Sequence, residues 1–106
     1  MFIEGSPHAV ADLWDVAAHH YNLRFTCPHC GHVRVFHAAG LWWLFKQRRW
    51  NDHLRVVPRR LACGVCRSVL RRTIRPHMEI VTDQETGEPL PLPPDREWKR
   101  YALRRR

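Results

Sequence analysis

Apolar residues recur at helical spacing near the beginning of the chain, within residues 9–20. This pattern predicts a short amphipathic helix. We expect the helix to start near Ser6 or His8 and to be followed by Asn22 in a left-handed conformation. The apolar positions are Val10, Leu13, Trp14 and Ala17.

Alternation of apolar and polar residues predicts four short strands, one on each side of two Cys-x-x-Cys pairs. Residues 23–27 and 33–36 flank the first pair, and residues 60–62 and 68–74 flank the second. Gly31 directly follows the first pair, where a positive φ lets backbone N–H groups turn toward sulfur. The sequence therefore predicts two hairpins of similar design.

Between the two pairs, residues 38–50 contain helix formers and are long enough for about three helical turns. A second, shorter helix is expected after Asn51 or Asp52, either of which can cap it. Pro58 should end this helix, because the residue before a proline avoids the α region. Both helices together form a helical insertion between the two pairs.

The composition changes after residue 82. Residues 83–94 contain four prolines, which predicts an extended linker. Residues 95–106 are rich in basic residues and place Trp98, Tyr101 and Ala102 on one helical face, so we expect either a docked helix or a mobile basic tail. The chain is accordingly divided into a domain of residues 1–82, the linker and the C-terminal segment.

Composition and charge refine this picture. The chain has 106 residues, of which 44% are hydrophobic, and a formal charge of +8. A domain of this size has only a modest core, so an additional stabilising element is expected. Residues 34–82 hold eleven lysines and arginines against two acidic residues, a net charge of +9. The basic character therefore belongs to the region around the cysteine pairs.

All four cysteines belong to the two pairs, Cys27 with Cys30 and Cys63 with Cys66. Structural zinc sites have four tetrahedral ligands, so the pattern predicts one structural Zn²⁺ with no position open to water or substrate. The 32 residues between Cys30 and Cys63 exceed the roughly 15 to 20 residues of a compact ribbon spacer, and the helical insertion accounts for the excess. A thiol redox pair and a site without metal are the alternatives.

Some neighbours of the cysteines have two interpretations. His29 or His32 can replace a cysteine in a mixed site, although a complete set of cysteines needs no substitute. Four arginines either offset the negative charge of a zinc tetrathiolate or lie on the solvated face of strands. They are Arg24, Arg34, Arg60 and Arg67.

Together these motifs resemble a group of small, uncharacterised bacterial zinc-ribbon proteins. The resemblance covers roughly residues 10 to 75, and this chain departs from it where Arg67 replaces the usual glycine after the last cysteine. It implies a zinc-binding domain with a regulatory or nucleic-acid-binding role and no assigned activity. The matching positions are Asp15-Val16-Ala17, Leu23, Cys27-x-x-Cys30-Gly31-His32, the helix around Leu41, and Arg60-Leu61-x-Cys63-x-x-Cys66.

We therefore expect an α+β fold. It would be a small zinc-ribbon-like domain with two knuckle hairpins, an N-terminal helix and a helical insertion between the knuckles.

Nucleic-acid binding is the first functional hypothesis. Arginines interleaved with aromatic residues can neutralise phosphates, and Trp42, Trp43 or Trp50 can stack on unpaired bases. A merely solvated charged face is the alternative. The basic positions are Arg48, Arg49, Arg59, Arg60, Arg71, Arg72 and Arg75.

Protein binding, as an adaptor or as a homodimer, is the second hypothesis. Apolar residues surround the helix expected within residues 38–50 instead of forming one stripe, so a small core is not expected to bury them all. The alternative is that the N-terminal helix and C-terminal aromatic residues cover them. The candidate partner-binding residues are Trp42, Trp43, Phe45 and Trp50.

The sequence contains no glycine-rich phosphate loop, Gly-x-Ser-x-Gly or His-Glu-x-x-His motif, so we expect neither an enzyme nor a small-molecule substrate. The N-terminus does not resemble a secretory signal, and no apolar run approaches about 18 residues. We therefore expect a cytoplasmic protein without membrane association, in which thiols favour metal over disulfide.

Overall fold

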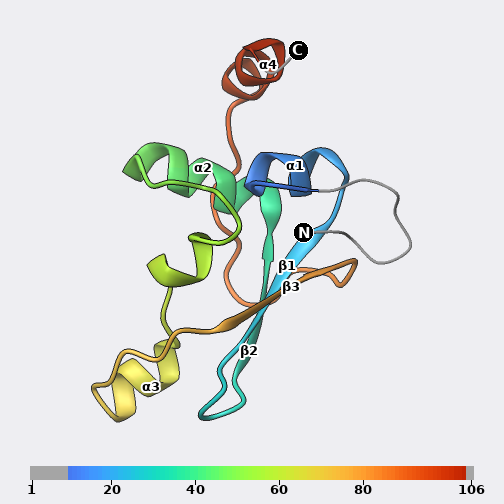
Figure 1. Cartoon of the computed structure of the whole chain (residues 1–106). Helices are drawn as coiled ribbons and strands as arrows, with labels where there is room; N and C mark the ends of the chain where they lie inside the picture. The colour runs from blue at the N-terminus through green and yellow to red at the C-terminus, as the bar shows by residue number, and fades with distance from the viewer. Residues whose placement is uncertain (1–9, 105–106) are drawn as a thin grey trace.

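A three-stranded antiparallel sheet lies at the centre of the computed structural model, which describes residues 10–104 (Figure 1). The strand order is β2-β1-β3, and helices α1 and α2 pack side by side at one end of the sheet. The predicted α+β class is confirmed. The bounds are β1 (Asn22–Thr26), β2 (Val33–His37), β3 (His77–Val81), α1 (Leu13–Ala18) and α2 (Ala38–Arg48).

The central strand β1 has the alternation that the sequence predicts. Leu23 and Phe25 are buried, whereas the intervening Arg24 is half-buried on the opposite face. Phe25 lies opposite Arg34 on β2 and Met78 on β3. Because side chains alternate between the two faces of a strand, Leu23 and Phe25 contribute to one core. The other fully buried members include Leu13, Val16, Leu41, Trp42 and Phe45.

The N-terminal helix is shorter than predicted. It begins at Leu13, because the Asp12 side chain caps it by accepting a 2.9 Å hydrogen bond from the Asp15 N–H. The expected start at Ser6 or His8 lies outside the described residues. The left-handed residue after the helix is His20, with φ of 62°, whereas Asn22 already belongs to β1. The prediction for Asn22 was therefore wrong.

The second predicted hairpin is not formed. A 3₁₀ helix, η1 (Val57–Arg60), precedes the second cysteine pair, and α3 (Gly64–Val69) contains part of the expected outgoing strand. Cys63 caps α3, since its sulfur accepts a hydrogen bond from the Cys66 N–H. Pro58 lies at the beginning of η1, where its missing N–H costs nothing, instead of ending a helix. The third strand of the sheet is β3, downstream of both pairs.

Residues 83–94 contain no helix or strand and run along the free edge of β2. Val35 donates to the Thr86 hydroxyl oxygen and accepts from the Thr86 N–H, both at 2.9 Å. A Cβ placed on Gly40 of α2 would lie 3.1 Å from the Leu90 Cβ, so this segment also packs closely against α2. The division into residues 1–82, 83–94 and 95–106 stays a prediction.

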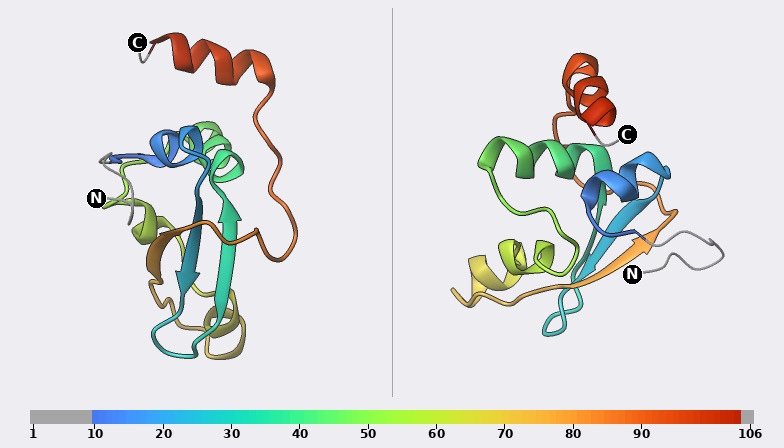
Figure 2. Two further views of the ribbon diagram at one scale, coloured as in Figure 1. Left: turned by 90° about the vertical axis from the view of Figure 1, so that its right-hand side faces the viewer. Right: turned by 45° about the horizontal axis from the view of Figure 1, so that its top comes forward.

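The C-terminal helix α4 (Asp95–Arg104) is docked on α1 and α2 (Figure 2). Trp98 stacks on Trp14, and Trp98 and Tyr101 both meet the ring of Trp42. The docked-helix alternative is the one that the structure adopts. Within residues 10–104, no helix has the length and apolar character needed to cross a membrane.

Candidate functional site: a four-cysteine centre beside a basic surface

The four cysteines converge from two separate parts of the chain. Cys27 and Cys30 belong to the turn between β1 and β2, whereas Cys63 and Cys66 belong to the N-terminal end of α3. All four sulfurs lie within 4.8 Å of one another. The predicted convergence into one possible metal site is confirmed.

The sulfur positions fit a tetrahedral metal ion. The distance from Cys27 Sγ to Cys66 Sγ is 3.7 Å, and that from Cys30 Sγ to Cys63 Sγ is 3.5 Å. Zinc–sulfur bonds of about 2.3 Å place the sulfurs of a regular tetrahedron about 3.8 Å apart. Each of these close contacts joins one cysteine pair to the other, so a single ion would link the β1–β2 turn to α3.

Backbone N–H groups point at three of the sulfurs. The N–H groups of Cys30 and His32 lie 3.5 and 3.4 Å from the sulfurs of Cys27 and Cys30, respectively. The Cys66 N–H lies 3.5 Å from the Cys63 sulfur. Gly31 has φ of 78°, which confirms the expected turn and brings the His32 N–H toward sulfur. These donors stabilise thiolates, the form that binds metal.

The thiols differ in acidity. The hydrogen bond from the Cys30 backbone N–H lowers the pKa of Cys27 to about 6. Burial, with the neighbouring thiols, raises the pKa of Cys66 to about 12. For Cys30, the hydrogen bond from the His32 N–H favours the thiolate, but burial and neighbouring thiols outweigh it and raise the pKa. The cluster therefore resists full ionisation unless a cation balances the charge.

The position of Cys63 at the beginning of a helix differs from the strand-flanked position that the sequence predicted. A helix N-terminus favours a thiolate, which is one element of redox Cys-x-x-Cys motifs. The segment before Cys63 is η1 and a short extended connection, and all four sulfurs share one centre. This geometry favours a common metal ligand set over two independent redox pairs.

The flanking residues take several different positions. His29 and His32 are exposed, and neither belongs to the cluster of four cysteines that could hold a metal ion. Arg24 pairs with Glu79 and Asp83, at 2.8 and 3.1 Å, on the face of the sheet opposite Phe25. Arg34 donates to the Glu88 carbonyl oxygen at 2.9 Å, and Arg60 and Arg67 are exposed.

The candidate partner-binding residues are less accessible than predicted. Trp42 and Phe45 are fully buried in the core, with 1% and 0% of their surface exposed, so they do not form an exposed patch. Trp43 and Trp50 are half-buried. Docking of α4 explains the burial of Trp42, because Trp98 and Tyr101 cover its ring.

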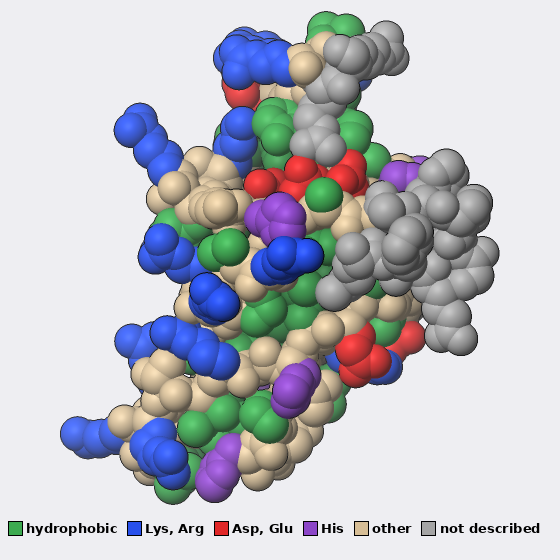
Figure 3. Space-filling view, in the orientation of Figure 1, with side chains coloured by type: hydrophobic (Ala, Val, Ile, Leu, Met, Phe, Trp, Pro, Cys, Tyr) green, Lys and Arg blue, Asp and Glu red, His purple; other side chains and the backbone are tan. Residues whose placement is uncertain are grey.

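The predicted basic residues are exposed and occupy one edge of the molecule. In Figure 3, lysine and arginine side chains follow this edge from the C-terminal end of α2 past η1 to α3. Acidic side chains visible in that view lie nearer α1, α4 and the opposite edge. Among residues 10–104, the ion pairs involve Arg24 and Arg100, and none includes an arginine of this edge. The end of α2, η1, α3 and the residues that follow α3 carry the exposed Arg48, Arg49, Arg59, Arg60, Arg67, Arg71, Arg72 and Arg75.

Two of these arginines converge on one tryptophan. The guanidinium carbons of Arg48 and Arg60 lie 5.3 and 5.4 Å from the centroid of the Trp50 ring. Arg75 instead donates to the Leu61 carbonyl oxygen at 2.9 Å, beside the second cysteine pair. The structure thus brings the end of α2, η1 and the approach to Cys63 into one basic surface.

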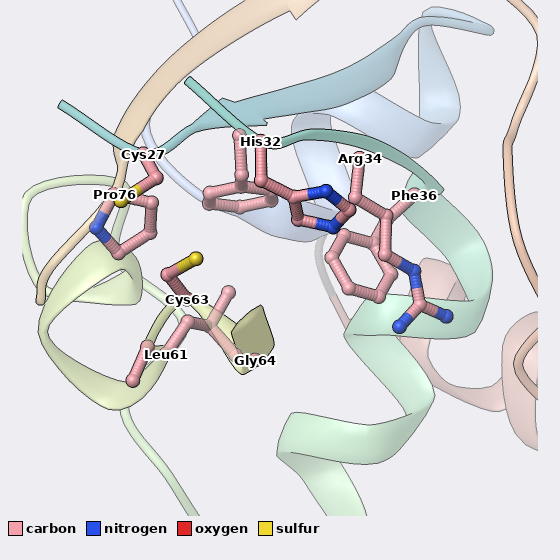
Figure 4. Close-up of a pocket in the computed structure, with 10 residues that line it drawn as sticks. Cys27, His32, Arg34, Phe36, Leu61, Cys63, Gly64 and Pro76 are labelled. Carbon is pink, nitrogen blue, oxygen red and sulfur yellow. The ribbon is translucent and has the colours of Figure 1, made fainter. Parts of the chain in front are cut away.

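A pocket of about 190 Å³ borders the cysteine centre (Figure 4). Sequence reasoning missed it, although the alternation of His32, Arg34 and Phe36 places these side chains on one face of the extended segment. The opposite wall of the pocket comes from residues 61–64. No local sequence pattern indicates that this segment lies close to β2. The lining residues are Phe25, Cys27, His32, Arg34, Phe36, Leu61, Ala62, Cys63, Gly64 and Pro76.

Comparisons with known proteins found no matching family model, curated protein or solved structure. The four-cysteine cluster is consistent with a zinc-binding domain, whereas membership of a zinc-ribbon family stays a prediction.

Proposed function

We propose that this chain is a structural-zinc domain that acts as a nucleic-acid-binding or regulatory module. The observation that carries the metal assignment is the convergence of four cysteine sulfurs within 4.8 Å. Zinc is the ion that four thiolates in a tetrahedral arrangement favour. Four protein ligands fill its coordination shell, so the proposed role of the ion is structural and not catalytic.

The proposed zinc ion would stabilise the part of the molecule farthest from α4. In Figures 1 and 2, α3 and the turn between β1 and β2 lie at this end. The cysteine cluster of this end is a small group separate from the main core, with Ile74 as its half-buried apolar neighbour. Because few apolar contacts hold α3, metal–ligand bonds would supply much of its stability.

Metal content per purified chain tests this assignment. We expect one zinc ion per wild-type chain, and its loss with disordering of α3 in Cys63→Ser. Ser68→Ala, an exposed position on the same helix, is the matched control and should retain the ion. A wild-type chain that folds fully with no bound metal contradicts the proposal.

The exposed arginine edge supports nucleic-acid binding. Its arginines make no ion pair within residues 10–104, so their charge is available to phosphates. Arg48 and Arg60 also lie against the half-buried Trp50, so charge and an aromatic ring occur together. Proteins that bind single strands combine these two features.

Fluorescence anisotropy with labelled single-stranded RNA, single-stranded DNA and duplex DNA tests the binding at 25 to 200 mM salt, roughly the range over which phosphate contacts weaken strongly. The double variant Arg59→Glu/Arg72→Glu should bind more weakly. For duplex DNA, the slope of the logarithm of the binding constant against the logarithm of the salt concentration should become less steep by about two. Arg96→Glu with Lys99→Glu, exposed on α4, makes the same change in net charge and should have a much smaller effect. No binding by the wild type at low salt would overturn the proposal.

Protein binding is a second candidate, through α3 instead of the tryptophans of α2. The apolar residues Val65, Val69 and Leu70 are 42%, 73% and 45% exposed at the end of the molecule that holds the cysteines. Sedimentation tests self-association directly. A concentration-dependent dimer that Val69→Asp disrupts, combined with no nucleic-acid binding, would favour this candidate.

A further inference from the structure

The pocket beside the cysteine centre has walls from two distant parts of the chain. His32, Arg34 and Phe36 come from β2 and the residue before it, and they face Leu61, Cys63 and Gly64 across the space (Figure 4). Its volume is about 190 Å³. The pocket is thus formed only when the second cysteine pair lies against the β1–β2 turn.

The metal site does not account for this space. Cys27 and Cys63 line the pocket, but Cys30 and Cys66 do not. An ion held among all four sulfurs would border the pocket without occupying it. The pocket therefore has room for a separate ligand.

The walls are suited to a flat ring. Phe25 and Phe36 meet edge to face, with ring centroids 5.5 Å apart and an angle of 77° between their planes. His32 adds a third ring, and the remaining lining includes Leu61, Ala62 and Pro76. Aromatic walls bind any planar ring through its π face, with little demand on its substituents.

Arg34 adds hydrogen-bond donors to the wall of the pocket. Its guanidinium carbon lies 4.2 Å from the Phe36 ring centroid, and one terminal nitrogen donates to the Glu88 carbonyl oxygen. The Arg34 Nε is fully buried, without a hydrogen-bond partner in the described part of the chain, and so is out of reach of a ligand. The terminal nitrogens of the guanidinium carry more N–H donors than the single bond to Glu88 uses, so a ligand with an acceptor atom can bind to them.

The surroundings of the pocket are basic. None of its described lining residues is acidic. Arg60 precedes Leu61 in the chain, and Arg75 precedes Pro76 and donates to the Leu61 carbonyl oxygen. The volume is below the roughly 300 Å³ of pockets for drug-sized ligands, so the interior suits a single small ring. A ligand that suits this pocket therefore has a small planar ring with acceptor atoms on its edge, and carries negative charge on a part that stays outside the pocket.

We propose that this pocket takes one unpaired nucleobase of a single-stranded nucleic acid, whose edge accepts from the Arg34 guanidinium and whose neighbouring phosphate lies near Arg75. The inference rests on the proposed nucleic-acid binding and narrows it to single strands. A paired base in a duplex is not available to the pocket unless it is first unstacked.

The test compares two oligonucleotides of equal length, oligo-dT and the same strand with abasic sites in place of its bases. They carry the same phosphates, so only base contacts distinguish them. We expect the wild type to bind oligo-dT about tenfold more tightly, the scale of one base–aromatic contact. Oligo-U is measured in parallel to distinguish RNA from DNA, and a preference for bases in either sugar series supports the proposal.

Gly64→Leu is the variant that narrows the pocket in this test, because Gly64 lines it and a Cβ there meets no atom within 4 Å and strains no positive φ. The preference for bases should disappear in this variant, while binding to the abasic strand and its salt dependence stay unchanged. Ser68→Leu adds the same side chain at an exposed position of α3 outside the pocket and should retain the preference. Arg34→Lys keeps the charge but loses the planar guanidinium donors, and should weaken the preference without changing the salt dependence.

Different failures separate the two proposals. Equal affinity of the wild type for oligo-dT and for the abasic strand would overturn the pocket assignment and leave nucleic-acid binding intact. An unchanged preference in both Gly64→Leu and Arg34→Lys would also overturn it. Absence of binding to every strand at low salt would remove the proposed function itself.

Discussion

Trp98 of α4 stacks on Trp14 of α1, with ring centroids 5.6 Å apart and planes inclined by 22°. The same ring meets the edge of Trp42 on α2 at 5.3 Å. These contacts join the C-terminal helix to both helices of the main core. None of the described residues of α4 is fully buried, so the helix depends on this aromatic cluster for its position.

Trp98→Ala should release α4 from the core. The variant loses one stacked and one edge-to-face ring contact, and we expect a loss of about 2 kcal/mol in the free energy of unfolding, below the 3–5 kcal/mol typical of a fully buried tryptophan. Hydrogen exchange of residues 95–104 measures undocking, and urea unfolding measures stability. Leu103→Ala, at a position 64% exposed on the same helix, should change neither. Unchanged protection of α4 in Trp98→Ala would contradict this prediction.

Gly40→Val should displace the segment that leads to α4. A Cβ at Gly40 would lie 3.1 Å from the Leu90 Cβ and 3.4 Å from the Leu90 carbonyl oxygen, and a branched side chain needs more room still. Overpacking of this kind costs about 1–3 kcal/mol. Gly64→Ala, where a Cβ meets nothing within 4 Å, is the control. Stability of Gly40→Val equal to that of the wild type would show that Leu90 moves away without cost.

Asp12→Ala should destabilise α1 through the loss of its cap. The Asp12 carboxylate accepts from the Asp15 N–H at 2.9 Å, and removal of such a cap costs about 1 kcal/mol. Asp12→Asn keeps an acceptor oxygen and should retain most of the stability. Thermal unfolding of the wild type, Asp12→Ala and Asp12→Asn measures their relative stabilities. Equal losses in both variants would assign the effect to the charge of Asp12 and not to the capping hydrogen bond.

Metal affinity should rise steeply with pH. Cys27, with a pKa of about 6, is mostly ionised above pH 7, whereas the raised pKa values of Cys30 and Cys66 keep both thiols protonated there. Metal binding must displace at least these two protons, so affinity should increase at least about a hundredfold per pH unit between pH 7 and 8. Below about pH 6, protonation of Cys27 should make metal affinity depend still more steeply on pH. Release of fewer than two protons at pH 7 to 8 would contradict the prediction.

Calorimetry in two buffers of different ionisation enthalpy counts the released protons directly. Zinc titrated into the reduced chain at pH 7.5 provides the measurement. Cys30→Ser, which removes one of these protonated thiols, should release about one proton fewer, although its affinity is also lower.

Local patterns predicted several elements because they need only short-range information. The helix formers and the length of residues 38–50 indicated α2, and the alternation around Leu23 and Phe25 indicated β1. The prediction of a strand after Cys66 was wrong, because Val69 is the last residue of α3, the helix capped by the Cys63 sulfur, and Leu70 is its C-cap. The third strand of the sheet is instead formed by residues 77–81.

The sequence alone determined that four cysteines would share one centre, because two Cys-x-x-Cys pairs without a leftover thiol satisfy the ligand number of one metal ion. It also determined the excess of basic residues around them. Only the tertiary structure decided which surfaces are available. Docking of α4 buries Trp42, while the approach of residues 61–64 to β2 creates the pocket at Arg34. Burial depends on contacts between residues distant in the chain, and these contacts follow from packing and not from local spacing.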